Sequence, residues 1–233
     1  VFRKTMKVGI PKERIDGEAR VATTPEIARK MISGGLQVLL ERGAGEDAYY
    51  SDEAYREVGV ELTDAAGALG CDIVAKVRKP SGDEVAQMRD GAIFIGHSET
   101  CEQDPVVSAM HARKITVIAM ERIPRISRAQ SMDALSSQSN IAGYRAVIEA
   151  AGHFGRFLPL MMTSAGSAKP ARVIVLGAGV AGLQAIATAR RLGADVYAYD
   201  VRPETAEQIG SLGAKPITLD IGEAGGGEGG YAK

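Results

Sequence analysis

Short apolar runs alternate along the chain with segments whose apolar residues recur at helical spacing. Before residue 122 the runs are KVGIP (7–11), QVLLE (37–41), DIVAKV (72–77), AIFIG (92–96) and TVIAME (116–121), with a weaker one at VEL (60–62). Continuous apolar strands that alternate with amphipathic helices are typical of a parallel sheet with helices on both faces. The pattern therefore predicts a first α/β domain over residues 1–130.

The same alternation returns after residue 171. RVIVL, DVYAYD and KPITLD predict strands, and the segments LQAIATARRLGA and PETAEQIGSLGA predict helices between them. This second α/β unit, over residues 163–233, has only three predicted strands. The fold class is thus α/β, with two Rossmann-like domains and parallel sheets, of which the second is incomplete. We expect the chain to be a fragment of a longer polypeptide, because a half-sheet leaves an open edge.

Between the two units lies a polar segment that becomes a helix. Apolar residues at helical spacing predict one long helix over about 131–156 within a linking segment, 131–162. These residues are Ile141, Tyr144, Val147, Ile148 and Ala151. The small residues of TSAGSAKPA (163–171) predict an irregular linker after it.

Several helix starts carry capping signals. Thr24 precedes Pro25, and Ser51 stands three residues before Ala54, as N-cap residues do. Asp83, three residues before Ala86, predicts a further cap.

Composition and charge narrow the class of partner. The apolar fraction is 45%, the formal net charge is -1, and no dense basic stretch occurs, so nucleic acid and anionic membrane surfaces are poor partners. No run approaches the ~20 apolar residues of a spanning helix, so we expect no direct membrane insertion. The two cysteines lack metal-ligand spacing, which fits a reducing compartment.

The strongest motif is GAGVAG, which follows an apolar strand and opens a helix. Gly177 permits a tight turn, Gly179 lets a pyrophosphate approach the backbone, and Gly182 lets the helix pack against the strand. Backbone amides and the positive end of the helix dipole then face the phosphates. The motif in this context predicts a dinucleotide site.

An acidic residue, Asp200, ends the next strand, 21 residues after Gly179. A carboxylate there accepts hydrogen bonds from the adenosine ribose hydroxyls, and it would repel a 2′-phosphate. This favours NAD over NADP. Arg202 leaves an alternative, because it could accommodate a phosphate or simply neutralise Asp200.

The segment PRISRAQSMDALSSQSNIAGYRAV (124–147) carries unusually many polar groups for a connector. Arg125, Gln130 and Asp133 could converge on a nicotinamide, whose carboxamide needs both a donor and an acceptor. A structural alternative is equally open: Ser127 and Gln130 fit a capping box, and Asp133 suits a first helical turn.

Other polar residues are weaker candidates. Lys12, Arg20 and Lys76 lie near predicted strand ends, where they could bind a substrate carboxylate, although surface charge is the commoner explanation. His97 could serve as a proton-transfer base, but a capped, solvent-facing histidine is the commoner case.

Taken together, GIPKER with RVA near the start, PRISRAQSMDALSSQSNIAGYRAVIEAA, GAGVAGLQAIATARRLGA and GGYAK resemble one family. It is the NAD(H)-binding alpha subunit, domain I, of proton-translocating NAD(P) transhydrogenase. The resemblance covers residues 7–233, and the central segment is its most specific part. The wider superfamily includes alanine dehydrogenase.

The resemblance implies site residues. In the family an arginine, a glutamine, an aspartate and a serine hold the dihydronicotinamide, and they match Arg125, Gln130, Asp133 and Ser136 here. The implied nucleotide contacts are Gln130, Ser131, Met132, Asp133, Ala178, Gly179, Val180, Asp200, Val201, Arg202 and Gly230. Tyr231 matches the tyrosine of a loop that closes over the nucleotide.

The resemblance also implies partners. The family's domain I is a peripheral homodimer that passes hydride to NADP(H) on a beta subunit, while protons move through a separate membrane domain. We accordingly expect a cytoplasmic location, peripheral to the inner membrane through partner subunits. Two alternatives remain: an NAD-dependent enzyme like alanine dehydrogenase, in which Arg20 and Lys76 would serve pyruvate, and a truncated, non-catalytic NAD-binding module.

Overall fold

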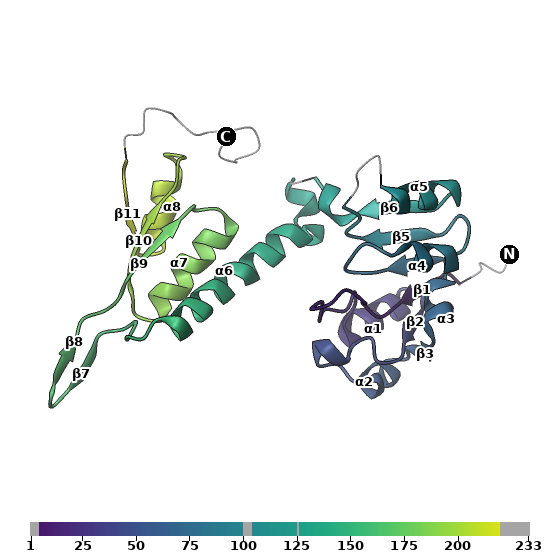
Figure 1. Cartoon of the computed structure of the whole chain (residues 1–233), viewed down its shortest axis with the longest axis horizontal. Coiled ribbons are helices and arrows are strands. Elements are labelled where there is room, and N and C mark those ends of the chain that lie inside the picture. The colour runs from purple at the N-terminus through teal and green to yellow at the C-terminus, as the bar shows by residue number, and fades with distance from the viewer. Residues whose placement is uncertain (1–4, 100–103, 125, 220–233) are drawn as a thin grey trace. The chain divides into compact units, whose positions relative to one another are not determined.

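The computed structural model describes residues 5–99, 104–124 and 126–219, which form two units (Figure 1). The first unit ends at Pro124, and the second begins at the next residue. Both are α/β with parallel sheets, which confirms the predicted fold class. Within the described residues, none of the helices combines the length and apolar character that crossing a bilayer requires.

The first unit is built on a six-stranded parallel sheet of order β3-β2-β1-β4-β5-β6. The strands are β1 (Lys7–Ile10), β2 (Gln37–Glu41), β3 (Glu61–Thr63), β4 (Ile73–Ala75), β5 (Ile93–Gly96) and β6 (Thr116–Ala119). The order reverses between β1 and β4. In open α/β sheets this reversal is the point where a crevice opens beyond the carboxyl ends of the strands.

Short helices connect these strands. They are α1 (Pro25–Ser33), η1 (Glu46–Ala48), α2 (Asp52–Glu57), α3 (Ala65–Leu69), α4 (Gly82–Gln87) and α5 (Pro105–Ala112), and η2 (Met120–Arg122) follows β6. Thr24 and Ser51 cap α1 and α2 as predicted. The prediction for Asp83 is wrong: Ser81 caps α4 and forms a capping box with Glu84, so Asp83 lies inside the first turn.

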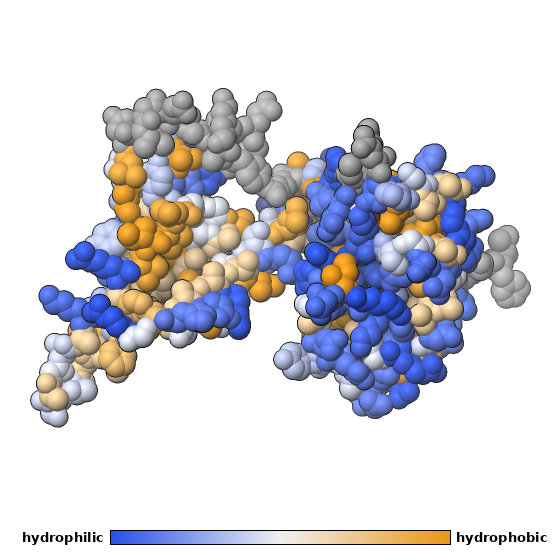
Figure 2. All heavy atoms as spheres, viewed as in Figure 1, coloured by the Kyte–Doolittle hydropathy of each residue, from blue (hydrophilic) through white to orange (hydrophobic). Residues whose placement is uncertain are grey.

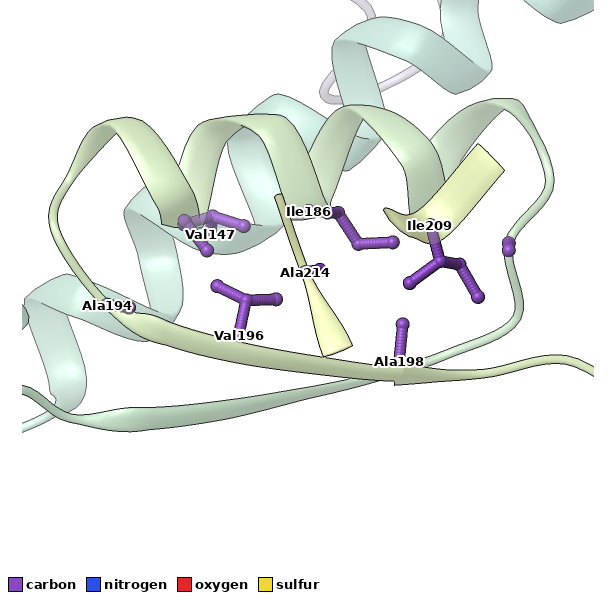
Figure 3. Packing of buried hydrophobic residues seen from close by; sticks show 9 residues of the cluster. Val147, Ile186, Ala194, Val196, Ala198, Ile209 and Ala214 are labelled. Carbon is purple, nitrogen blue, oxygen red and sulfur yellow. The ribbon is translucent and has the colours of Figure 1, made fainter. Parts of the chain in front are cut away.

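The second unit contains the three predicted strands as a parallel sheet of order β11-β10-β9. The elements are β9 (Arg172–Leu176), α7 (Val180–Arg191), β10 (Asp195–Tyr199), α8 (Thr205–Ser211) and β11 (Lys215–Pro216). Figure 3 shows the core, in which Ile186 of α7 and Ile209 of α8 lie over Val196 and Ala198 of β10.

A long helix, α6 (Ala134–His153), belongs to this second unit and packs on α7. A Cβ on Gly143 would lie 2.1 Å from the carbonyl oxygen of Ala181, so glycine is what allows the two helices to approach this closely. Asn140 donates a hydrogen bond to Gln184 at 3.1 Å. The predicted start at residue 131 is wrong, because a 3₁₀ helix, η3 (Ser127–Met132), precedes α6 and Asp133 separates the two.

The predicted linker at 163–171 is partly an antiparallel hairpin, β7 (Met161–Thr163) and β8 (Gly166–Ala168). Residues 164 and 165 form the turn between them, and Gly166, the first residue of β8, adopts φ 139°. Small residues gave no alternating pattern, so the sequence carried no strand signal here.

Strand β9 forms one edge of the second sheet within the described residues. Its side chains Ile174 and Leu176 are 62% and 79% exposed. Figure 2 shows apolar surface gathered on this unit in the region of the three strands.

Candidate functional site

The glycine-rich turn between β9 and α7 has the geometry that its sequence predicts. Gly177 adopts φ 95°, a left-handed conformation that disfavours other residues. A Cβ on Gly182 would lie 1.8 Å from the carbonyl oxygen of Gly177, so only glycine lets the helix approach the turn. A Cβ on Gly179 would meet no heavy atom within 4 Å, which leaves the space beside its backbone open.

Helix α7 begins directly at this open space. Its N-cap is Gly179, and no side chain caps its first amides. Uncapped amides at a helix N-terminus carry partial positive charge and bind anionic oxygens. The turn and the helix start can therefore cradle a phosphate group.

Asp200 lies where β10 ends, and its carboxylate is fixed to this turn. The Asp200 Oδ2 atom accepts a hydrogen bond from the Ala178 backbone N–H at 2.6 Å. The Asp200 side chain is only 6% exposed. The Arg202 guanidinium, which hydrogen-bonds this carboxylate, holds the pKa of Asp200 well below its ordinary value. The carboxylate is thus a charged acceptor at the end of the second strand.

Arg202 binds that carboxylate through both its backbone and its side chain. The backbone N–H and Nε of Arg202 each donate to Asp200 Oδ1 at 2.9 Å, and Nη2 donates to Oδ2 at 3.1 Å. Val201, between them, is partly buried. The sequence left two roles for Arg202, binding a phosphate or neutralising Asp200, and in this structure the side chain pairs with Asp200.

The polar segment before α6 presents exposed side chains. Gln130, Ser131 and Met132 lie in η3 and are exposed. The predicted Ser127–Gln130 capping box is absent, because the N-cap of η3 is Ile126, which provides no side-chain cap, and Ser127 is the first residue of the helix. Gln130 therefore has no structural role in that cap.

Asp133 instead caps α6. Its Oδ1 accepts from the Ser136 backbone N–H at 2.9 Å, and its Oδ2 accepts from the Ser136 hydroxyl at 2.7 Å. The structure thus brings Asp133 and Ser136 together. Arg125, Gly230 and Tyr231 lie outside the described residues.

Both candidate groups belong to the same unit, since α6 carries Asp133 and Ser136 and packs on the helix that begins at the glycine turn. Within the described residues, no group of three or more histidine, cysteine or acidic side chains could hold a metal ion. The described part of the site offers the backbone amides of the turn, the Gln130 amide, the Asp133–Ser136 pair and the Asp200–Arg202 pair.

The polar candidates of the first unit are bound to other side chains of their own unit. Lys76 is 4% exposed, so surface charge is the wrong interpretation for it. Its Nζ lies 2.7 Å from Glu84 Oε1 and 3.7 Å from Glu13 Oε2. Burial raises the pKa of Glu13, and the Lys76 ammonium opposes that effect.

Arg20 and His97 likewise have acidic partners. Arg20 donates through Nε and Nη2 to Glu18 at 2.7 Å and 2.6 Å, and this hydrogen bonding lowers the pKa of Glu18. His97 Nδ1 lies 3.6 Å from Glu121 Oε2, and its side chain is mostly buried. Sequence reasoning missed Glu13 and Glu84. Val77, to which Glu13 is bound, lies 64 residues along the chain, and the pairing of Glu84 with Lys76, 8 residues away, crosses from a strand end to a helix, so neither leaves a periodic signal.

Comparison with known proteins identifies the family of the chain. The sequence matches the family model "Alanine dehydrogenase/PNT, N-terminal domain" over residues 9–142 and the corresponding C-terminal domain model over residues 146–225. An NAD(P) transhydrogenase alpha-subunit protein of Rhodospirillum rubrum is 54% identical over 222 residues, which are 92% of this chain and 58% of that protein. The chain thus spans somewhat more than half the length of this relative.

Two solved structures share the fold. The transhydrogenase from Sinorhizobium meliloti matches with a TM-score of 0.90 and 49% identity over 94% of this chain and 63% of that one. An L-alanine dehydrogenase matches with a TM-score of 0.81 and 26% identity over 92% of this chain and 61% of that one.

Proposed function

The chain belongs to the alanine dehydrogenase/PNT family, and from this premise we propose that it is the NAD(H)-binding component of a proton-translocating NAD(P) transhydrogenase. The observation that carries the proposal is the open glycine turn with Asp200 fixed beside it. The much higher identity to transhydrogenase alpha subunits than to alanine dehydrogenases supports this choice within the family.

In this proposal the second unit binds the dinucleotide. Gly177 and Ala178 form the turn, and their amides hydrogen-bond Tyr199 and Asp200. The amides of Gly179 and Val180 face the pyrophosphate, and Gly182 keeps α7 close enough to the turn for this approach. Asp200 accepts hydrogen bonds from the adenosine ribose hydroxyls, and the backbone of Val201 and Arg202 follows the ribose.

The nicotinamide end is held by the segment before α6. Gln130 supplies an amide donor and acceptor for the carboxamide, and Arg125, Asp133 and Ser136 complete the polar clamp with the backbone of Ser131 and Met132. Asp133 is held in place by Ser136, so its orientation is set before a ligand arrives. In the same proposal Gly230 contacts the nucleotide and Tyr231 closes over it.

This polar site suits transfer of hydride between two nicotinamide rings. The bound dihydronicotinamide supplies the hydride, and direct transfer to a second ring requires alignment rather than a general base. Oxidation of an amino acid also moves a proton and needs a base and a carboxylate site. Lys76 and Arg20, the residues that would bind such a carboxylate, are ion-paired within the first unit.

The acceptor in this scheme is NADP⁺ on a beta subunit, and a membrane domain carries the protons. We propose that the chain works as a homodimer, on the cytoplasmic side, held at the inner membrane through these partners.

The deciding experiment follows the hydride. NADH deuterated at the transferred position is mixed with NADP⁺, this chain and the NADP-binding subunit, and the NADPH is examined by mass spectrometry. The proposal expects deuterium in NADPH without exchange with water. NADH oxidation by pyruvate and ammonia without any partner would instead identify an alanine-dehydrogenase-like enzyme. NADH binding without either reaction would identify a non-catalytic module.

The role of Gln130 has its own test. Gln130→Asn shortens the side chain by one methylene, so it should slow hydride transfer by about tenfold to a hundredfold while changing the NADH Kd only severalfold, because misplacement acts mainly on alignment. Gln138→Asn, also exposed and on α6, is the matched control. Equal losses in the hydride-transfer rate and in NADH affinity would show that Gln130 contributes to binding but does not align the nicotinamide.

A further inference from the structure

The Asp200–Arg202 pair is built more tightly than a surface ion pair. Two donors of the guanidinium fork engage both carboxylate oxygens, and the Arg202 backbone N–H adds a third hydrogen bond. The side chains of Asp200 and Arg202 are 6% and 15% exposed. A bidentate, largely desolvated pair of this kind is charge-assisted and directional.

The position of this pair matters for the choice of coenzyme. An acid at the end of the second strand of a dinucleotide fold faces the adenosine 2′ position, where NAD carries a hydroxyl and NADP a phosphate. A carboxylate accepts from the hydroxyl and repels the phosphate. While Nε and Nη2 of Arg202 are bound to the Asp200 carboxylate, they are not available to a 2′-hydroxyl or to a 2′-phosphate.

We propose that Arg202 is a selectivity residue of this NAD(H) site: its fork fixes the Asp200 carboxylate for the ribose hydroxyls, and loss of that carboxylate redirects the fork to a 2′-phosphate. The inference rests on the proposed function, because it assumes that a dinucleotide occupies the glycine turn.

The geometry explains why the redirected arginine remains in place. The Arg202 backbone lies beside Asp200, and Pro203 follows it with a fixed φ. The Arg202 carbonyl also accepts from the Thr205 hydroxyl at 2.7 Å and from its backbone N–H at 3.2 Å. Removal of the carboxylate therefore leaves Nε and Nη2 near the space that the carboxylate oxygens occupied. Oxygens of a 2′-phosphate satisfy the same two donors.

The test is a double-mutant cycle on the chain, with NADH and NADPH fluorescence titrations of the wild type, Asp200→Ser, Arg202→Ala and the double variant. The wild type prefers NADH. Asp200→Ser shifts the NADPH-to-NADH affinity ratio toward NADPH by about tenfold to a hundredfold, as expected for one or two charge-assisted hydrogen bonds. The double variant loses that gain, and Arg202→Ala alone weakens NADH without gaining NADPH.

Two controls separate selectivity from folding. Arg191→Ala removes an exposed cation from the end of α7 and leaves the ratio unchanged. Asp200→Asn retains an oxygen that can accept from the Ala178 amide, and it should shift the NADPH-to-NADH affinity ratio in the same direction by a smaller factor. It therefore provides the measurement even if Asp200→Ser unfolds.

The outcomes distinguish the two proposals. Equal NADPH affinity in Asp200→Ser and the double variant, or no gain in Asp200→Ser and Asp200→Asn, overturns the role of Arg202 and leaves NADH binding intact. A wild-type chain that binds no NADH overturns the proposed function itself and this inference with it.

Discussion

In the parallel sheets of both units, an acidic side chain at the end of one strand binds a backbone amide in the loop after the neighbouring strand. In the first unit, Glu41 at the end of β2 accepts a hydrogen bond at 2.8 Å from the backbone N–H of Lys12, in the loop after β1. In the second unit, Asp200 accepts one at 2.6 Å from Ala178, in the loop after β9. Each acid also binds an arginine, Arg14 in the first case and Arg202 in the second.

The loop after β1 and the loop after β9 differ in the side chains that they place beyond the strand ends. In the first unit, Glu13 inserts a buried carboxylate that accepts from the backbone N–H groups of Val77 and Arg78 at 2.6 Å and 3.4 Å. These amides follow β4, where the strand order reverses. In the second unit, Gly179 has no side chain, and the space beside it is open.

The same strand arrangement therefore supports fold stability in one unit and ligand binding in the other. Amides beyond the carboxyl ends of parallel strands attract anionic groups. The first unit satisfies its amides with its own glutamate, so they stabilise the fold. The second unit leaves the amides at the start of α7 uncapped for a ligand. Substitutions in the two loops should therefore affect stability in one unit and binding in the other.

The largest effect is expected at Lys76. Lys76→Met removes the cation that faces Glu13 and Glu84 and leaves two buried carboxylates, which should lower the free energy of unfolding by about 3–5 kcal/mol at neutral pH. The loss should shrink in acid, because protonation neutralises the carboxylates. Urea unfolding measures it, and NADH affinity should not change.

Lys30→Met is the matched control, because Lys30 pairs with Glu26 on an exposed helix face. An exposed pair contributes less than about 1 kcal/mol. Similar losses for both lysines would contradict the structural role assigned to the buried pair.

A somewhat smaller loss is expected at Gly182. A Cβ there meets the Gly177 carbonyl oxygen at 1.8 Å, so Gly182→Ala must displace α7 from the turn, at about 3 kcal/mol of stability. NADH binding should fall with it. Gly152→Ala, in a helix with no heavy atom near its Cβ, should instead be neutral or stabilising by up to about 1 kcal/mol. Thermal unfolding that ranks the two variants in the opposite order would refute the close packing.

The smallest structural effect, with a clear effect on binding, is expected at Gly179. Gly179→Ala adds a methyl group to open space, so stability should change by less than about 1 kcal/mol. The methyl group fills room that a pyrophosphate needs, so the NADH Kd should rise about tenfold or more. Calorimetry gives both quantities, and an unchanged Kd would show that the ligand does not approach this backbone.

Local patterns predicted most of the fold. Each of these features depends only on residues close together in the sequence, which is why a sequence pattern predicted it: the strands, the GAGVAG turn and the caps at Thr24 and Ser51. The start of α6 was missed because Asp133 can be a first-turn residue or a cap, and only its bonds to Ser136 decide. The hairpin at 161–168 has no periodic apolar pattern.

The site was predictable only where its parts are close in sequence. Asp200 was expected from its distance to the glycine motif, but its bond to Ala178 and its fork with Arg202 depend on how β9 and β10 pair. Glu13, Lys76 and Glu84 meet only in the folded first unit. Lys76 was therefore expected on the surface.

The most direct test of the central claim is amide hydrogen exchange with and without NADH. We expect NADH to slow exchange at the amides of residues 179–182, at the glycine turn and the start of α7, and to leave the amides of Val77 and Arg78 unchanged because Glu13 already holds them. Protection at Val77 and Arg78 with none at 179–182 would contradict the assignment of the second unit as the coenzyme site.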